Sequence, residues 1–99
     1  MNNIQIQYQG FHPSEFTRAF LAAKLSEIQS EAPTGATLKA VFRRRDHLLT
    51  ASVSILSRAG DFFAHAEGKH LREVCRHLLH RSQRQLERWH DRRKGRRSS

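Results

Sequence analysis

Hydrophobic and polar residues alternate with a period of two in several short stretches of the chain. Near the N-terminus, Ile4, Ile6 and Tyr8 alternate with three glutamines, a pattern typical of a strand with one buried side. The same alternation recurs in three later stretches, at 36–43, 49–56 and 62–67. Clusters of turn-forming residues separate these stretches. We therefore predict four strands, the last three of which follow one another directly.

Two other stretches follow the period of a helix. The first begins after Ser14, a favourable N-cap with Glu15 in the first turn, and we expect it to end near Ser30. Its apolar side comprises Phe16, Phe20, Leu21, Leu25 and Ile28. The second begins at Lys69 and contains no proline or glycine before Gly95, where we expect it to end. The chain therefore has two amphipathic helices.

The second helix separates apolar from basic residues around its axis. At ~100° per residue, one side collects Ser82 together with the apolar residues Leu71, Val74, Cys75, Leu78, Leu79, Leu86 and Trp89. The opposite side collects arginines and histidines: Arg72, Arg76, His77, His80, Arg81, Arg84 and Arg88. One side can therefore pack on a core while the other presents a row of cations to solvent.

The order of elements is β-α-β-β-β-α, which indicates an α+β fold. Three successive strands with short connections should form an antiparallel meander, and the first strand should join them by a crossover through the first helix. Because each helix has one apolar side, we expect both to pack on one face of a four-stranded sheet. Thr50, Ser52 and Ser54 suit the uncovered face. We predict a single domain at 1–94 and a flexible basic tail at 95–99.

The positive charge of the chain is concentrated in its last third. The formal net charge is +9, and residues 69–97 hold eleven basic and three acidic side chains, whereas residues 1–68 hold seven and six. Like charges one helical turn apart, such as Arg84 and Arg88, each cost roughly a few tenths of a kcal/mol. A charged helix side can be merely solvated. One of nearly uniform sign that costs folding free energy instead favours a polyanionic partner.

Four other features have two interpretations each. Lys24 lies within the apolar arc of the first helix, where it either extends its ammonium group to water or places a cation beside the second helix. The arginines at 43–45 are expected in a hairpin connection, as a solvated turn or as a phosphate contact. Trp89 either packs in the core or stacks on a nucleobase. One of Phe62 and Phe63 must face away from the helices, as a stacking candidate or as plain surface.

No pattern of residues predicts a metal site or an enzyme. Cys75 faces the apolar arc while His77 and His80 face outward, and no C-x-x-C or H-E-x-x-H spacing occurs. The acidic residues are scattered, without a pair suited to acid–base catalysis. A single cysteine excludes an internal disulfide, and residues 1–99 hold no membrane-spanning apolar run. We expect no signal peptide, because the first ten residues are polar and alternating. We expect a cytoplasmic, non-enzymatic protein without cofactor, metal, membrane contact or small-molecule substrate.

Three features of the chain occur together in a known family. One is the helix after Ser14 with Lys24 before its last apolar turn, and another is the alternating stretch 51–55 followed by a turn with Gly60. A third is the Arg-Gln-Leu segment at 84–86, with basic residues after it. Over nearly its whole length the chain thus resembles the ribosome hibernation-promoting factor and ribosome-associated inhibitor family, in its short single-domain form.

The resemblance implies a fold and a function. Members are β-α-β-β-β-α domains similar in build to double-stranded-RNA-binding modules. They bind the small ribosomal subunit between head and body, with basic residues of both helices on its ribosomal RNA, and block messenger and transfer RNA. For this chain the resemblance implies a monomeric translation inhibitor of the stationary-phase stress response. The candidate RNA-binding residues are Lys24, Lys69, Arg72, Arg76, Arg81, Arg84, Arg88, Arg92, Arg93 and Lys94. Lys24 and Arg84 match family bases by position.

The chain departs from the family's pattern at two points. Where the family usually opens its last helix with Asp-Leu/Met-Tyr, this chain has His70, Leu71 and Arg72, so it lacks the aromatic residue and an acid favourable to the helix dipole. We also expect no second domain of the kind with which long members pair ribosomes, so we do not expect this chain to pair them alone. Two further binding roles stay open: a generic double-stranded RNA module, and a regulator that docks its basic helix on an acidic protein.

Overall fold

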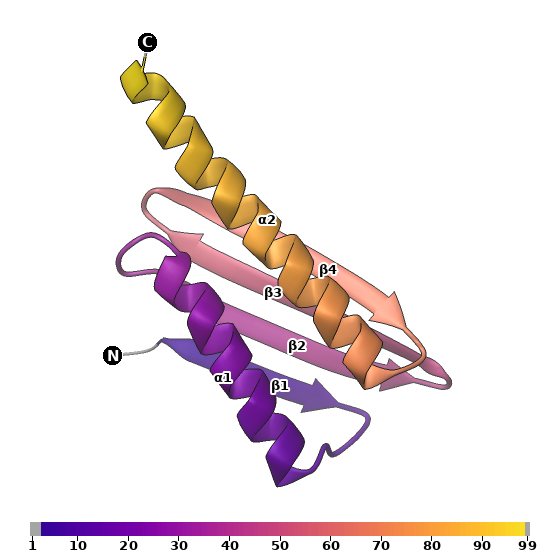
Figure 1. Cartoon of the computed structure of the whole chain (residues 1–99). Helices are drawn as coiled ribbons and strands as arrows, with labels where there is room; N and C mark the ends of the chain where they lie inside the picture. Colours follow the sequence, from indigo (N-terminus) through magenta and orange to yellow (C-terminus); the bar gives the residue numbers. More distant parts are fainter. Residues whose placement is uncertain (1–2, 99) are drawn as a thin grey trace.

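The structure, a computed structural model, describes residues 3–98, with side chains through Arg92. Its elements follow the predicted order: β1 (Ile4–Gln9), α1 (Glu15–Glu31), β2 (Thr37–Arg45), β3 (Leu48–Ser57), β4 (Gly60–Gly68) and α2 (Leu71–Ser98). The sheet has the order β1-β2-β3-β4, with β1 parallel to β2 and the other neighbours antiparallel. Both helices lie on one face of this sheet (Figure 1). The predicted α+β fold is therefore confirmed.

The core lies between the sheet and the two helices. Alternate strand residues point into it, and the register aligns them in rows across the sheet, such as Ile6, Ala40 and Val53. The helices add the buried residues Leu21, Leu25, Ile28, Val74, Cys75, Leu78 and Leu86. The residues between the buried positions of β3, among them the predicted Ser52 and Ser54, belong to the uncovered face. The period of two therefore predicts correctly which face of each strand is buried.

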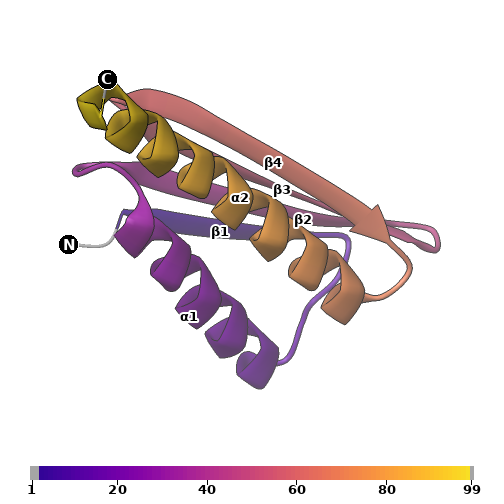
Figure 2. The same cartoon turned by 45° about the horizontal axis from the view of Figure 1, so that its top comes forward.

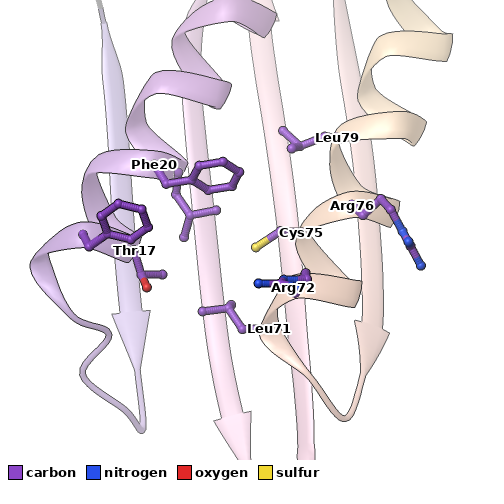
Figure 3. A pocket seen from close by; sticks show the side chains of 9 residues that line it. Thr17, Phe20, Leu71, Arg72, Cys75, Arg76 and Leu79 are labelled. Carbon is purple, nitrogen blue, oxygen red and sulfur yellow. The ribbon is translucent and has the colours of Figure 1, made fainter.

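The N-terminal half of α1 differs from the prediction. The pattern predicts Phe16 and Phe20 in the core, but they are 82% and 47% exposed. At ~100° per residue, both lie about 100° or more around the axis from Leu21 and Leu25, which face the sheet and are buried. Figure 2 shows the N-terminal end of α1 farther from the sheet than its C-terminal end. The two rings instead border an open cleft between α1 and α2 (Figure 3).

The arginines at 43–45 belong to β2 and not to a hairpin connection, so this prediction is wrong. β2 and β3 stay paired as far as Arg45 and Leu48, which leaves Asp46 and His47 as the turn. Asp46 has a φ of 57°, in the left-handed region that aspartate adopts more readily than most residues. Continued strand pairing thus places the three basic residues on a rigid element.

α2 differs from the prediction at both ends. It begins at Leu71 rather than at Lys69, and it continues past Gly95 to Ser98. A single glycine costs a helix only about 1 kcal/mol, and no proline follows it. The helical backbone therefore runs into the segment 95–99, whose flexibility stays a prediction and whose last residue, Ser99, lies outside the described residues.

Gly10 connects β1 to α1 at a point where the chain passes close to β2. Its φ is +82°, and a Cβ atom there would collide with the backbone carbonyl oxygen of Arg44. Gly35, between α1 and β2, has a nearly equal φ of +81°, but a Cβ atom there would meet open space. Both glycines therefore adopt a left-handed backbone conformation, but only Gly10 has no room for a Cβ atom.

We predict that Gly10→Ala destabilises the protein more than Gly35→Ala. Both variants place a side chain in the left-handed region, at a cost of about 1–2 kcal/mol. Only Gly10→Ala adds a collision with backbone, which raises the cost by a further ~1–3 kcal/mol. Urea unfolding followed by circular dichroism measures both free energies of unfolding. Equal losses would contradict the close approach of Gly10 to Arg44.

Candidate nucleic-acid interface

α2 is held against the sheet by its apolar side. Val74 and Leu86 are completely buried, and Leu78 nearly so. Ser82 is also buried, and its hydroxyl donates a hydrogen bond to the carbonyl oxygen of Leu78, with 2.9 Å between the oxygens. Burial of each large aliphatic side chain contributes about 1.5–3 kcal/mol, so these residues determine how α2 is rotated about its axis. The basic side consequently faces solvent.

Two polar side chains of α2 bind the edge of the sheet. The side chain of Gln85 accepts a hydrogen bond from the backbone N–H of Phe63, at 3.1 Å, and donates one to the carbonyl oxygen of the same residue. Arg81 donates a hydrogen bond to the carbonyl oxygen of His65, at 2.5 Å. Because β4 is an edge strand, these are backbone groups that another strand could otherwise pair with. We call these three contacts the β4 clamp.

The basic residues of α2 do not all face the same neighbour. A step of four residues rotates the helix surface by about 40°, so a row of such steps winds around the axis. Arg72 and Arg76 border the cleft with α1, whereas Arg84 and Arg88 border β4. All four side chains are exposed. The basic row therefore crosses the outer side of α2 from one neighbouring element to the other.

A shallow groove lies between β4 and the middle of α2. This β4–α2 groove has a volume of about 470 Å³ and is lined by Phe63, Ala64, His65, His80, Arg81, Arg84, Gln85 and Arg88. Phe63 is 60% exposed, whereas Phe62 is buried and packs edge-on against Trp89, with 6.1 Å between the ring centroids. Phe63 is thus the outward-facing ring of the pair. Trp89 packs against the core, as in the first of its two interpretations.

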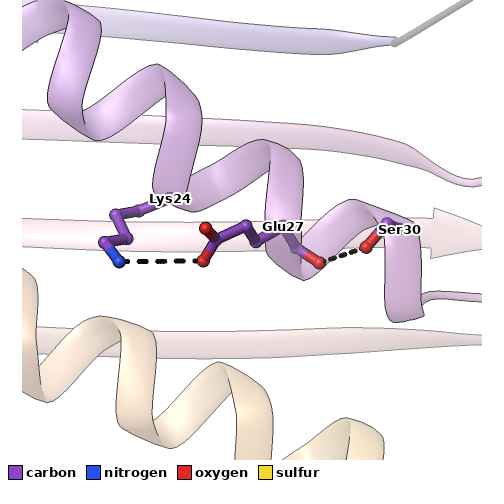
Figure 4. A network of polar contacts seen from close by, with 3 residues as sticks. All are labelled: Lys24, Glu27 and Ser30. Atoms are coloured by element: carbon purple, nitrogen blue, oxygen red, sulfur yellow. Dashed lines mark hydrogen bonds and ion pairs between the residues drawn. The ribbon is translucent and has the colours of Figure 1, made fainter.

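Lys24 lies beside a second groove, between α1 and α2. This groove is lined by Lys24, Glu27, Arg76, Leu79, His80 and Gln83. The Nζ atom of Lys24 is 3.8 Å from Oε2 of Glu27, as Figure 4 shows, and 5.7 Å from the ring centroid of Phe20. The Lys24 side chain is 42% exposed, and such pairs are typically worth about 0–1 kcal/mol. Its side chain is therefore partly open to water and also borders the groove shared with α2, so both interpretations hold in part.

The arginines of α2 whose side chains are described, from Arg72 to Arg92, are not neutralised by the protein's own carboxylates. Within the part of the chain whose side chains are described, Lys24 and Glu27 form the only ion pair. The basic groups at 72, 76, 81, 84, 88 and 92 therefore have no carboxylate oxygen within 4.0 Å. A row of exposed, uncompensated cations attracts polyanions more strongly than a row of mixed sign.

Not all of the predicted site residues come together. Six of them are exposed along α2: Arg72, Arg76, Arg81, Arg84, Arg88 and Arg92. Lys69 precedes the helix and borders a different hollow, with Arg43 and Arg45 near the β2–β3 turn. The side chains of Arg93 and Lys94 lie outside the described residues. Sequence reasoning offered one of Phe62 and Phe63 as a stacking candidate without deciding between them. It left Gln85 out of the site, because its position depends on how β4 meets α2.

Cys75 is not poised for chemistry. Burial raises the pKa of its thiol to about 11, so the thiol stays protonated near neutral pH and is a poor nucleophile and metal ligand. Among the side chains through Arg92, no three histidine, cysteine or acidic groups are placed to hold a metal ion. No helix within residues 3–98 is both long and apolar enough to cross a membrane.

Two solved structures have a similar fold. A ribosomal subunit interface protein from Coxiella burnetii has a TM-score of 0.73 and 18% sequence identity, and the similarity covers 89% of this chain and 97% of that one. The N-terminal domain of Protein Y from Thermus thermophilus has a TM-score of 0.76 and 16% identity, over 90% and 99% of the two chains. No protein-family model and no curated protein sequence matches the chain. The resemblance drawn from the sequence is therefore confirmed for the fold.

We predict that Gln85→Ala opens the edge of β4. The substitution removes two hydrogen bonds to Phe63, and we expect a loss of about 1–2 kcal/mol in the free energy of unfolding. Amide hydrogen exchange measured by NMR should show faster exchange at Phe63, while the central strands keep their protection. Gln83→Ala is the matched control, because Gln83 lies on the same helix but borders α1. Equal exchange at Phe63 in both variants would show that the β4 clamp does not hold the strand.

Proposed function

We propose that this protein is a ribosome hibernation factor, which binds the ribosomal RNA of the small subunit through α2 and thereby blocks messenger and transfer RNA. The observation that carries the proposal is the exposed row of uncompensated arginines on a helix that is packed rigidly against the sheet. The fold, which the chain shares with a ribosomal subunit interface protein, supports the same partner. The inhibition is steric, so it requires neither a catalytic residue nor a cofactor.

Electrostatic attraction supplies most of the affinity in this proposal. The part of α2 whose side chains are described, Leu71 to Arg92, is about 33 Å long at 1.5 Å per residue. This length lets its cations contact several phosphates. Each contact releases counterions from the RNA, so the affinity should fall steeply as salt concentration rises. Specificity comes from the shape of folded RNA, because side chains read the grooves of A-form helices poorly.

The β4–α2 groove is suited to an unpaired stretch of this RNA. Phe63 offers a flat, exposed ring, and Arg84 and Arg88 offer guanidinium groups along the same groove. Proteins bind single-stranded RNA with this combination, because bases stack on aromatic rings while cations bind the phosphates. The β4 clamp holds the backbone of Phe63, so the ring is positioned before RNA binds. Phe63 therefore joins the predicted basic residues in the proposed interface.

We predict that Arg84→Glu combined with Arg88→Glu abolishes binding to small ribosomal subunits. The variant places two carboxylates where phosphates would lie. At low salt, where residual binding is measurable, the slope of log affinity against log salt should also be smaller by about two, one for each lost phosphate contact. Co-sedimentation with purified subunits over a series of salt concentrations measures both effects. Unchanged sedimentation would remove α2 from the interface.

The matched control is Arg18→Glu combined with Arg58→Glu. These exposed residues lie on α1 and in the β3–β4 turn, outside the β4–α2 groove, and their reversal changes the net charge by the same amount. We expect this control to keep most of its affinity, since neither residue belongs to the basic row of α2. Equal loss of affinity in both variants would indicate attraction to net charge alone.

Two further measurements separate the alternative roles. Equal affinity of the unchanged protein for ribosomes and for any RNA duplex would favour the generic RNA-binding module. Binding that survives nuclease treatment would favour an acidic protein partner.

We predict that Phe63→Leu weakens binding of single-stranded RNA, whereas Phe63→Trp preserves it. Leucine keeps an apolar surface but loses the flat ring, and stacking of one base is worth about 1–3 kcal/mol. Fluorescence anisotropy with a labelled oligoribonucleotide measures the difference. Because Phe63 is mostly exposed, neither variant should alter the free energy of unfolding by much. Equal affinities of the two variants would exclude stacking as the role of this ring.

A further inference from the structure

The cleft between the N-terminal halves of α1 and α2 is separate from the β4–α2 groove. It has a volume of about 550 Å³ and is lined by Phe16, Thr17, Phe20, Leu21, Leu71, Arg72, Cys75, Arg76 and Leu79. Figure 3 shows Phe20 on α1 across from Leu71, Cys75 and Leu79 on α2. No residue lines both this N-terminal cleft and the β4–α2 groove.

The walls of the N-terminal cleft are apolar, and much of that surface is exposed. The side chain of Phe16 is mostly exposed to solvent, and about half of the side chain of Phe20 is exposed. Leu71 and Leu79 are half-buried on the opposite wall. A strongly polar chain gains no stability from exposed phenylalanines, and grouped exposed apolar side chains on a monomer commonly mark a binding surface. A volume of this size accommodates one or two large side chains of a ligand.

The charge at the cleft has a single sign. Its charged lining residues are Arg72 and Arg76, and no acidic residue contributes to the lining. In Figure 3 the side chain of Arg72 reaches from α2 toward α1, whereas the guanidinium group of Arg76 points away from α1. Lys24, next to the ring of Phe20, is paired with Glu27 and adds no net charge near the cleft. An occupant that carries a carboxylate beside an apolar group therefore complements the cleft.

We propose that the N-terminal cleft binds an acidic, amphipathic segment of a partner protein. An apolar side chain of the partner inserts between Phe20 and Leu79, and a flanking carboxylate binds Arg72, whose side chain reaches across the cleft. A protein side chain fits better than a nucleobase, because the polar edge of a base would be buried against apolar walls with few hydrogen-bonding groups. A short amphipathic helix provides this arrangement, since apolar anchors and carboxylates can occupy adjacent faces.

This interaction goes beyond the proposed binding of RNA and does not depend on it. The cleft borders the segment of α2 from Leu71 to Leu79, whereas Arg84 and Arg88, together with Phe63 of β4, border the β4–α2 groove farther along the helix. Unpaired RNA in the β4–α2 groove and an acidic segment in the cleft therefore contact different residues. In this proposal Arg72 binds a carboxylate, and the phosphate contacts of the proposed function are made by Arg76 and the later arginines of the row.

The proposal can be tested with synthetic peptides. The probe is a fluorescein-labelled helical peptide with leucines on one face and glutamates on the others, and the control is a peptide of identical composition whose order gives no apolar face. Because the protein is strongly basic, both peptides gain from general attraction, and only the difference between them reports on the cleft. We expect the amphipathic peptide to bind at least tenfold more tightly by fluorescence anisotropy. NMR signals of residues 16–20 and 71–79 should shift, while those of β4 stay in place.

Two sets of protein variants complete the test. Phe16→Ala combined with Phe20→Ala should weaken binding of the amphipathic peptide at least tenfold and leave the control peptide unaffected. Arg72→Glu should lower the affinity for the amphipathic glutamate peptide. It should raise the affinity for a peptide of the same design in which lysines replace the glutamates. Equal binding of the two glutamate peptides, or an unchanged affinity of the phenylalanine variant, would overturn the proposal. So would an oligouridylate that displaced the peptide and shifted the same cleft signals, because the cleft would then bind RNA.

Discussion

The packing of α2 on the last two strands is the interaction on which the other properties of the molecule depend. Val74 and Leu86 bury the helix in the core, while Gln85 and Arg81 bind the outer edge of β4. The same helix thus completes the core, protects an edge strand and presents cations to solvent. A rotation about its axis would disrupt all three at once. This coupling explains how a surface rich in repelling arginines can still hold a defined orientation.

The winding of the basic row has a consequence for function. Because positions four apart rotate by about 40°, an unbroken row cannot stay beside one neighbour along a helix of this length. Its first members, Arg72 and Arg76, line the same cleft as the exposed phenylalanines of α1. Its later members, Arg84 and Arg88, line the same groove as Phe63 of β4. The same type of side chain therefore has two different surroundings. Apolar walls favour a protein segment at one end, and a single exposed ring favours unpaired RNA at the other.

Local periodicity predicts the strands, the helices and nearly all buried positions, because each depends on neighbours a few residues apart. It predicts the burial of Phe16 and Phe20 wrongly. The apolar arc of α1 does not reveal how much space separates its N-terminal half from α2. It also cannot place Lys69 near Arg43 or give Gln85 its contact with β4, because those contacts join distant segments. The outward face of α2 could be predicted, whereas the two surfaces that it shares with other elements required coordinates.

Similarity of fold at 16–18% identity constrains the core far more than the surface. Many sequences place apolar residues at the same alternating and helical positions, so the backbone path persists while exposed residues are replaced. Binding of RNA depends on the exposed residues, and a shared fold alone does not supply them. The argument for a polyanionic partner therefore rests on this chain's own uncompensated arginines. At Arg72, where the resembling family usually has a tyrosine, the exposed cation borders the apolar cleft, so the departure from the family coincides with the surface that suits a second partner.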